Sequence, residues 1–237
     1  MLPVAVFRFS QTEGPGYLGN FLTQKGILWE QLNVDAGDRV PENINGYSGL
    51  VLMGGPMSVN DELPWIGPLL DLIRQAVSQN VPVLGHCLGG QLMSKALGGT
   101  VGPNPIKEIG WGEVSKCGLN PAPDWLGPLP SSFEVFQWHG ETFSIPNGAE
   151  HLLESPFCAN QGFLLNQRHL GLQCHIEMTA AMIEAWCEAG ADEIAQAAGS
   201  PAVQRPPLMQ EAMPARLERL HGIADILYGK WIEGLRA

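Results

Sequence analysis

Basic residues are scarce in this chain. Of its 237 residues, 13 are Lys or Arg and 24 are Asp or Glu, giving a formal net charge of −11 at pH 7. The basic residues are spread along the chain and form no run. Surfaces that bind nucleic acid or anionic membranes need clustered Lys and Arg. The composition therefore argues against nucleic acid or a membrane as the main partner.

Long apolar runs are also missing, since no stretch approaches the roughly 18 apolar residues that a membrane helix needs. The opening residues MLPVAVFRFS have no basic segment before their apolar stretch, which Arg8 interrupts, so they make a poor signal peptide. The five cysteines are widely spaced and form no CxxC pair. We expect a cytoplasmic protein without a disulfide framework, a metal site or a cofactor.

The first hundred residues alternate between two patterns. Short apolar runs typical of buried parallel strands occur at 3–9, 27–34, 49–55 and 82–87. Segments with helical character lie between or after them, at 15–25, 66–79 and 88–97. This order predicts an α/β fold, with a mostly parallel sheet flanked by helices in three layers.

The pattern changes after Gly98. Short extended segments divided by Gly and Pro predict antiparallel additions to the sheet, at 111–116, 133–139, 150–154, 163–166 and 170–175. Helical spacing returns from residue 178, and the proline-rich segment 199–215 is interpreted as a connector. We expect one domain over 1–237, with a core of about 1–190 and a helical C-terminal extension of about 191–237 that covers the core.

A nucleophile motif lies in the stretch VLGHCLGGQ. Its G-x-C-x-G pattern places Cys87 between a predicted strand and a predicted helix, as in the thiol form of a nucleophile elbow. The helix N-terminus favours a thiolate there. A buried structural cysteine in a glycine-rich turn is the alternative. His86, next to Cys87, is expected to be structural, although a charged His86 would favour the thiolate.

A base for this nucleophile is offered by the segment QCHIE. His175 and Glu177 are two residues apart, so in an extended strand both side chains point to the same face. Glu177 could then orient the imidazole while its other ring nitrogen faces Cys87. The backbone N–H groups of Leu88 and Gly55, the latter in the turn GGP, are candidates for an oxyanion hole.

Together these segments resemble the class I glutamine amidotransferases. The resemblance rests on GGP at 54–56, GHCLGGQ at 85–91 and HIE at 175–177, and it extends to WHGE at 138–141. The segment KEIGW at 107–111 is similar to one in members close to the GMP synthase amidotransferase domain. The resemblance implies the flavodoxin-like fold of that family.

The resemblance also implies roles for particular residues. Cys87 is the nucleophile, His175 the base and Glu177 its orienting partner, with an oxyanion hole at Gly55 and Leu88. The glutamyl end of the substrate is held by Gln91, Trp138, His139 and Gly140. Trp138 stands where the family has a small polar residue, and Glu141 where it has Asp, so the pocket wall is expected to differ from that of the family.

The function implied is cysteine-dependent hydrolysis of a γ-glutamyl amide through a glutamyl thioester. Two versions remain open: a glutaminase subunit that passes ammonia to a synthetase partner, and a stand-alone hydrolase of another γ-glutamyl compound, such as a peptide. A protein of another class, which binds or regulates without catalysis, is a third alternative. A DJ-1-like stress protein is disfavoured because Leu88, and not His, follows the cysteine.

Overall fold

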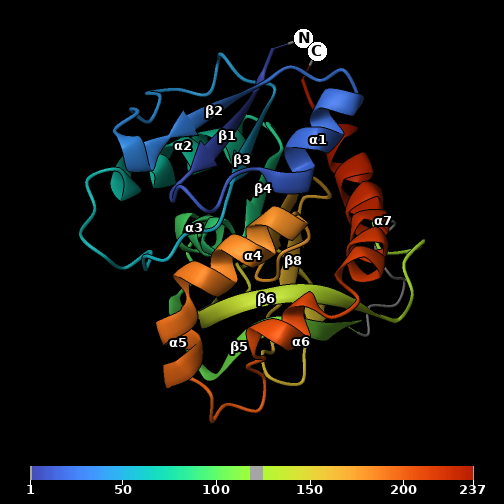
Figure 1. Ribbon diagram of the computed structural model, residues 1–237. Helices are drawn as coiled ribbons and strands as arrows, with labels where there is room; N and C mark the ends of the chain where they lie inside the picture. Colours follow the sequence, from blue (N-terminus) through green and yellow to red (C-terminus); the bar gives the residue numbers. More distant parts are fainter. Residues whose placement is uncertain (1, 118–124, 237) are drawn as a thin grey trace.

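The computed structural model describes residues 2–117 and 125–236, and this part of the chain builds a nine-stranded sheet (Figure 1). The strands are β1 (Val4–Arg8), β2 (Trp29–Asn33), β3 (Gly49–Leu52), β4 (Val83–His86), β5 (Val101–Lys116), β6 (Ser132–Phe143), β7 (Glu150–Glu154), β8 (Gly162–Leu165) and β9 (His169–Leu172). Their order across the sheet is β2-β1-β3-β4-β9-β8-β7-β5-β6.

The sheet has a parallel part and an antiparallel part. Strands β2, β1, β3, β4 and β9 run parallel to their neighbours, whereas β9, β8, β7, β5 and β6 pair antiparallel in that order. The predicted change of architecture after Gly98 is therefore confirmed. Strand β5 is longer than expected, because it pairs with β6 on both sides of an irregularity between Pro103 and Glu108.

Helices cover both faces of the sheet. They are α1 (Gly16–Gln24), α2 (Ile66–Ser78), α3 (Leu88–Ala96), α4 (Ala180–Ala189), α5 (Ala191–Gln196), α6 (Pro206–Gln210) and α7 (Met213–Ile232), with a 3-10 turn η1 (Val34–Ala36). Apolar side chains of α1 and of α4–α7 pack in one core cluster, and those of α2 and α3 pack in another. This is the expected three-layer α/β arrangement.

Alternation along the parallel strands divides residues between the two cores. Val4 and Val6 of β1 belong to the cluster under α1 and α7, whereas Ala5 and Phe7 belong to the cluster under α2 and α3. Successive side chains of a strand point to opposite faces, and here both faces are covered. The apolar runs at the start of the sequence are continuous for this reason.

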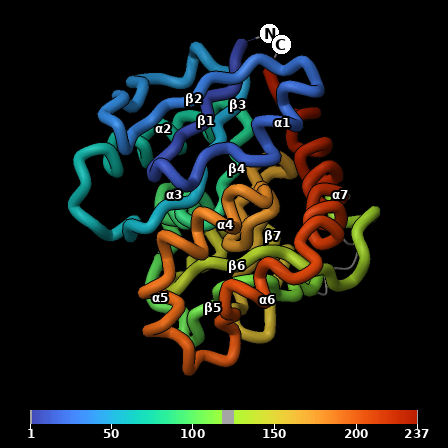
Figure 2. Tube along the Cα trace, viewed as in Figure 1, coloured from blue at the N-terminus to red at the C-terminus, as the bar shows by residue number. Residues whose placement is uncertain are grey.

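The C-terminal segment packs on the core. Helix α7 runs alongside α1 (Figure 2) and buries Leu220, Ala224, Leu227, Tyr228 and Trp231. The prediction of a plain connector at 199–215 is wrong in part, because Pro206–Gln210 form α6 and α7 begins at Met213. Proline fits the first turn of a helix, where an N–H has no intrahelical acceptor. No described helix is both long and apolar enough to cross a membrane.

Candidate active site

A cavity of about 620 Å³ opens beside the parallel strands. It lies beyond the carboxyl ends of β1, β3 and β4, where ligands bind in open α/β sheets. Its volume is within the range of small-molecule sites. Residues far apart in the sequence line it, among them Glu13, Gly55, Cys87, Gln91, Trp138 and Glu193.

Cys87 stands at a sharp turn between β4 and α3. Its backbone has φ 48° and ψ −107°, a strained conformation for a residue with a side chain. The Cys87 N–H donates to the carbonyl of Leu172 at 2.8 Å, which holds the turn against β9. A Cβ on Gly89 would overlap the backbone of Leu52, so the close approach of α3 to β3 requires glycine. The predicted elbow is therefore present.

Cys87 is 6% exposed and lines the cavity. Its Sγ lies 3.7 Å from the Trp138 carbonyl oxygen, and the Gln173 side-chain amide donates to it at 3.6 Å. The first turn of α3 follows directly, so the positive end of the helix dipole lies at the sulfur. These surroundings differ from those of an inert cysteine in an apolar core.

His175 and Glu177 form a short buried contact. His175 Nδ1 and Glu177 Oε1 are 2.6 Å apart, and each side chain is 1% exposed. The pair lies just beyond the end of β9, not inside a strand as predicted. His175 pairs with Phe136 of β6 through two backbone hydrogen bonds, of 2.8 and 3.2 Å. The Trp186 ring packs edge-on against the imidazole, with centroids 4.9 Å apart.

The charges of this pair support each other. Burial opposes ionisation of both groups, but the Glu177 carboxylate and the neighbouring Cys87 side chain raise the pKa of His175 well above its ordinary value. Burial would likewise raise the pKa of Glu177, yet His86 and His175 lower it to about 2. His175 Nε2 is buried and has no hydrogen-bond partner in the described chain. That nitrogen is available to exchange a proton with the sulfur.

His86 faces the carboxylate. Its Nε2 lies 3.7 Å from Glu177 Oε2 and 3.0 Å from the Tyr228 hydroxyl, and the ring is completely buried. Burial lowers the pKa of His86, although Glu177 opposes this and His175 reinforces it. Burial therefore disfavours the positive charge that His86 could supply next to the thiolate. His86 supports Glu177 instead.

The two backbone groups predicted for an oxyanion hole come from adjacent turns. Leu88 is the first residue of α3, so its N–H has no acceptor inside the helix. Gly55 follows β3 and lines the cavity, and a Cβ on it would meet Leu88 Cδ2 at 2.7 Å. A larger residue at position 55 would therefore have to displace the side chains of Leu88 and Met57.

Gln91, Trp138 and Gly140 all line the cavity, on the side of β6. The Gln91 side-chain amide donates to the Glu141 carbonyl at 3.3 Å, which ties α3 to this wall. The Trp138 indole N–H donates to Glu193 at 2.9 Å, and its ring packs edge-on against Trp186. Trp138 is thus part of the wall, at the position where the resemblance implies a small polar residue in the family.

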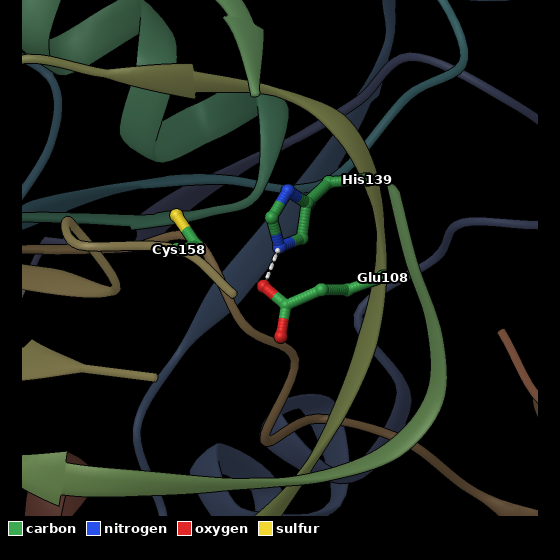
Figure 3. A group of neighbouring side chains, drawn as sticks. All are labelled: Glu108, His139 and Cys158. Carbon is green, nitrogen blue, oxygen red and sulfur yellow. Dashed lines mark ion pairs between the residues drawn. The ribbon is translucent and has the colours of Figure 1, made fainter. Parts of the chain in front are cut away.

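His139 turns its side chain into the wall behind the cavity. The ring is 1% exposed, with Nε2 lying 3.0 Å from Glu108 Oε2 and Nδ1 lying 3.1 Å from the Glu141 carbonyl (Figure 3). Ser155 and Gln161 also donate to the Glu108 carboxylate, at 3.0 and 2.8 Å. The imidazole of His139 is held inside the wall by Glu108 and the Glu141 carbonyl. His139 can therefore contact a substrate only through the part of the residue that lines the cavity.

Cys158 completes a cluster with Glu108 and His139 (Figure 3). The potential ligand atoms of the three side chains lie within 4.8 Å of one another, and among the described residues only this group has a spacing that could hold a metal ion. Burial raises the pKa of the Cys158 thiol. The thiol lies 3.2 Å from the Thr142 hydroxyl and donates to the Asn160 carbonyl at 3.6 Å. Each of the three side chains thus has polar contacts within the protein.

Glu13 is a cavity residue that no sequence motif predicted. It lies in the loop between β1 and α1, and among the described residues its side chain has no hydrogen-bond or ion-pair partner. A Cβ on Gly54 would overlap the Glu13 carboxylate and lie 3.1 Å from His175 Cε1. Burial raises the pKa of Glu13 to about 7; His175 opposes the shift, and Glu177 and Glu193 add to it. Its place after a parallel strand was the available signal.

The family model described as Glutamine amidotransferase class-I matches residues 23–184. The chain belongs to this family. It is 32% identical over 178 residues to the glutamine amidotransferase-like protein YfeJ of Salmonella typhimurium, covering 73% of this chain and 74% of YfeJ. It is 33% identical over 164 residues to the glutamine-hydrolyzing GMP synthase of Herminiimonas arsenicoxydans, covering 65% of this chain but only 29% of that protein.

Solved structures agree with this assignment. A glutamine amidotransferase from Methylobacillus flagellatus superposes with a TM-score of 0.96 at 45% identity, covering 100% of this chain and 96% of that one. A glutamine amidotransferase from Thermotoga maritima gives a TM-score of 0.87 at 30% identity, with 98% of each chain covered. The expected class I amidotransferase fold is confirmed, as is the resemblance to GMP synthase.

Proposed function

We propose that this chain hydrolyses a γ-glutamyl amide with Cys87, His175 and Glu177 as its catalytic groups. One observation carries the proposal: a buried His175–Glu177 pair leaves Nε2 of the imidazole unbonded, beside a cysteine on a strained elbow that faces a cavity. This arrangement matches the requirements of a base-activated thiol. Membership of the amidotransferase family supports the same chemistry.

The reaction begins when the Cys87 sulfur attacks the side-chain carbonyl carbon of the substrate. The thiol proton passes to His175 Nε2, and Glu177 stabilises the resulting imidazolium. The N–H groups of Gly55 and Leu88 stabilise the oxyanion. As the C–N bond breaks, His175 gives the proton to the leaving amine, and a glutamyl thioester remains on Cys87.

Water then completes the cycle. His175 takes a proton from the water, whose oxygen attacks the thioester carbon. The C–S bond breaks, glutamate leaves, and the proton returns to the sulfur. Gln91 and the wall at 138–140 hold the glutamyl end during both steps.

The fate of the leaving amine defines two versions of this function. In one, the substrate is glutamine and ammonia passes to a synthetase partner, as the likeness to part of GMP synthase suggests. In the other, the chain acts alone on another γ-glutamyl compound. The wall formed by Trp138 and the acidic groups in the cavity favour the second version.

Glutamate release from glutamine and from γ-glutamyl amides tests the proposal. The purified chain should release glutamate, and Cys87→Ala should abolish release while keeping the circular dichroism spectrum. Cys117→Ala is the matched control, because Cys117 does not line the cavity and should retain activity. Full activity of Cys87→Ala would overturn the mechanism. Inactivity of the unmodified chain on every substrate would favour a binding or regulatory protein.

A further inference from the structure

The cavity contains more negative charge than the hydrolysis of glutamine requires. Lys107 is the one Lys or Arg among its lining residues, and its ammonium lies 2.5 Å from Glu193, which also accepts from the Trp138 indole. Glu13 and Glu141 line the same cavity without an ion-pair partner in the described chain. Two carboxylates therefore remain uncompensated in a partly enclosed space, where charges interact strongly.

These two carboxylates lie on different walls. Glu141 belongs to β6, beside the residues proposed to hold the glutamyl end of the substrate. Glu13 comes from the loop after β1 and lies over Gly54 with His175 Cε1 close by. In the proposed reaction His175 protonates the leaving amine, so a carboxylate this close to the imidazole can contact that amine.

We propose that Glu13 binds an ammonium group of the leaving amine, so that the preferred substrate is the γ-glutamyl amide of an amine that carries a second positive charge. The inference rests on the proposed function, because it assigns a substrate class to the same site. The products are glutamate and the free diamine. One water molecule is consumed, and its oxygen becomes part of the glutamate side chain.

An unpaired carboxylate at this position is costly without a ligand. Its ionised form lacks a hydrogen bond from the protein. Burial disfavours it most, His175 favours it, and the acidic residues Glu177 and Glu193 disfavour it further. A bound ammonium would replace the lost water contacts with a charge-assisted hydrogen bond. The raised pKa of Glu13, about 7 in the absence of ligand, agrees with a site that is completed by a cation. The charge of the bound amine would favour the ionised carboxylate.

The experiment compares a cationic and a neutral substrate of matched size, together with an anionic substrate. The probes are γ-glutamyl-1,4-diaminobutane, its neutral isostere γ-glutamyl-n-pentylamide, and γ-glutamylglycine, whose leaving amine carries a carboxylate. Glutamine is included as the reference. We expect kcat/KM to be about tenfold higher for the cationic amide than for the neutral one, and lowest for γ-glutamylglycine. γ-Glutamyl amides of diamines with two to five carbons test which chain length brings the ammonium group to Glu13.

Glu13→Gln isolates the carboxylate. This variant keeps the size and hydrogen-bonding capacity of the side chain, and the ratio of kcat/KM between the cationic and neutral amides should fall to about one. The ratio cancels any general effect on His175. Glu141→Gln is the matched control, since it removes the other unpaired carboxylate from the opposite wall and should leave the ratio within about twofold.

The outcomes separate the two proposals. If glutamate is released from glutamine or the neutral amide with no preference for the cationic amides, the role of Glu13 is overturned and the proposed hydrolysis stands. A preference that survives Glu13→Gln, or is lost in Glu141→Gln, also overturns it. If no substrate gives Cys87-dependent release, the proposed function itself fails.

Discussion

The Tyr228 hydroxyl and His86 Nε2 share a buried hydrogen bond of 3.0 Å, between residues 142 positions apart in the sequence. Tyr228 lies in α7, so the C-terminal helix contacts the residue that directly precedes Cys87. The same His86 nitrogen lies 3.7 Å from Glu177. The helix thereby supports the candidate catalytic carboxylate from behind, in addition to covering the core.

Tyr228→Phe tests this support. The variant removes one buried hydrogen bond, and we expect it to lower the free energy of unfolding by about 1 kcal/mol. His86 would lose a partner next to Glu177, so the pH profile of kcat/KM should shift as well. Thermal denaturation and rates between pH 5 and 9 measure the two effects. The control is Tyr17→Phe, which removes an exposed hydrogen bond to Asp225 and should leave the pH profile unchanged.

Glu177→Ala should reduce kcat strongly but not to the level of Cys87→Ala. The variant leaves the imidazole without the carboxylate that raises its pKa and fixes its orientation, yet both reacting groups remain. By analogy with other triads, we expect a loss of roughly 10²–10⁴-fold in kcat. Single-turnover release of glutamate measures it. A rate equal to that of the unmodified chain would exclude an orienting role for Glu177.

The catalytic candidates were predictable from the sequence because their signals are local. Glycines around Cys87 indicate a sharp turn between a strand and a helix, and the two-residue spacing of His175 and Glu177 places their side chains together. The spacing led to the correct pairing although β9 ends at Leu172, before both residues. The chain bends on either side of His175, and the bridge to Phe136 holds the residue in place.

The supporting residues were not predictable in the same way. Tyr228 and His86 meet because α7 packs beside α1, and no motif marks Tyr228, although His86 lies within GHCLGGQ. Glu13 reaches His175 because the carboxyl ends of parallel strands meet at one edge of the sheet, which is a property of the topology. Pairing across the sheet also brings Glu108 to His139, in the register between β5 and β6.

Glu108→Gln should destabilise the wall of the cavity. It replaces the carboxylate that faces His139 at 3.0 Å and accepts from Gln161, which leaves a buried imidazole without its charged partner. Leaving buried polar groups without a hydrogen-bond partner costs about 1–3 kcal/mol, and we expect a loss in this range because the amide can keep some hydrogen bonds. Urea denaturation measures it. The control is Glu113→Gln, exposed on the same strand, which should change stability by less than about 0.5 kcal/mol.

Glu13→Gln should make the protein more stable at high pH. Between the ordinary Glu pKa of 4.5 and the folded value of about 7, the folded state binds the Glu13 proton more tightly than the unfolded state. The contribution of Glu13 to stability therefore falls as pH rises through this window and is constant above it. The Glu13→Gln variant has no such pH-dependent loss. Above pH 7 its free energy of unfolding should therefore exceed that of the unmodified chain, by at most about 3 kcal/mol.

The pKa shift of Glu177 has the opposite sign to that of Glu13, so Glu177 provides an internal control for the pH dependence of stability. Its folded pKa of about 2 lies below the ordinary 4.5, so its stabilising contribution is complete above pH 4.5 and is lost as pH falls toward 2. Urea denaturation at pH 5 and pH 8 then distinguishes the two residues. The difference in stability between Glu13→Gln and the unmodified chain should grow between these pH values, whereas that of Glu177→Gln should stay nearly constant. If Glu13→Gln were equally stable or less stable at pH 8, the carboxylate would have a structural partner, and its availability to a substrate ammonium would be refuted.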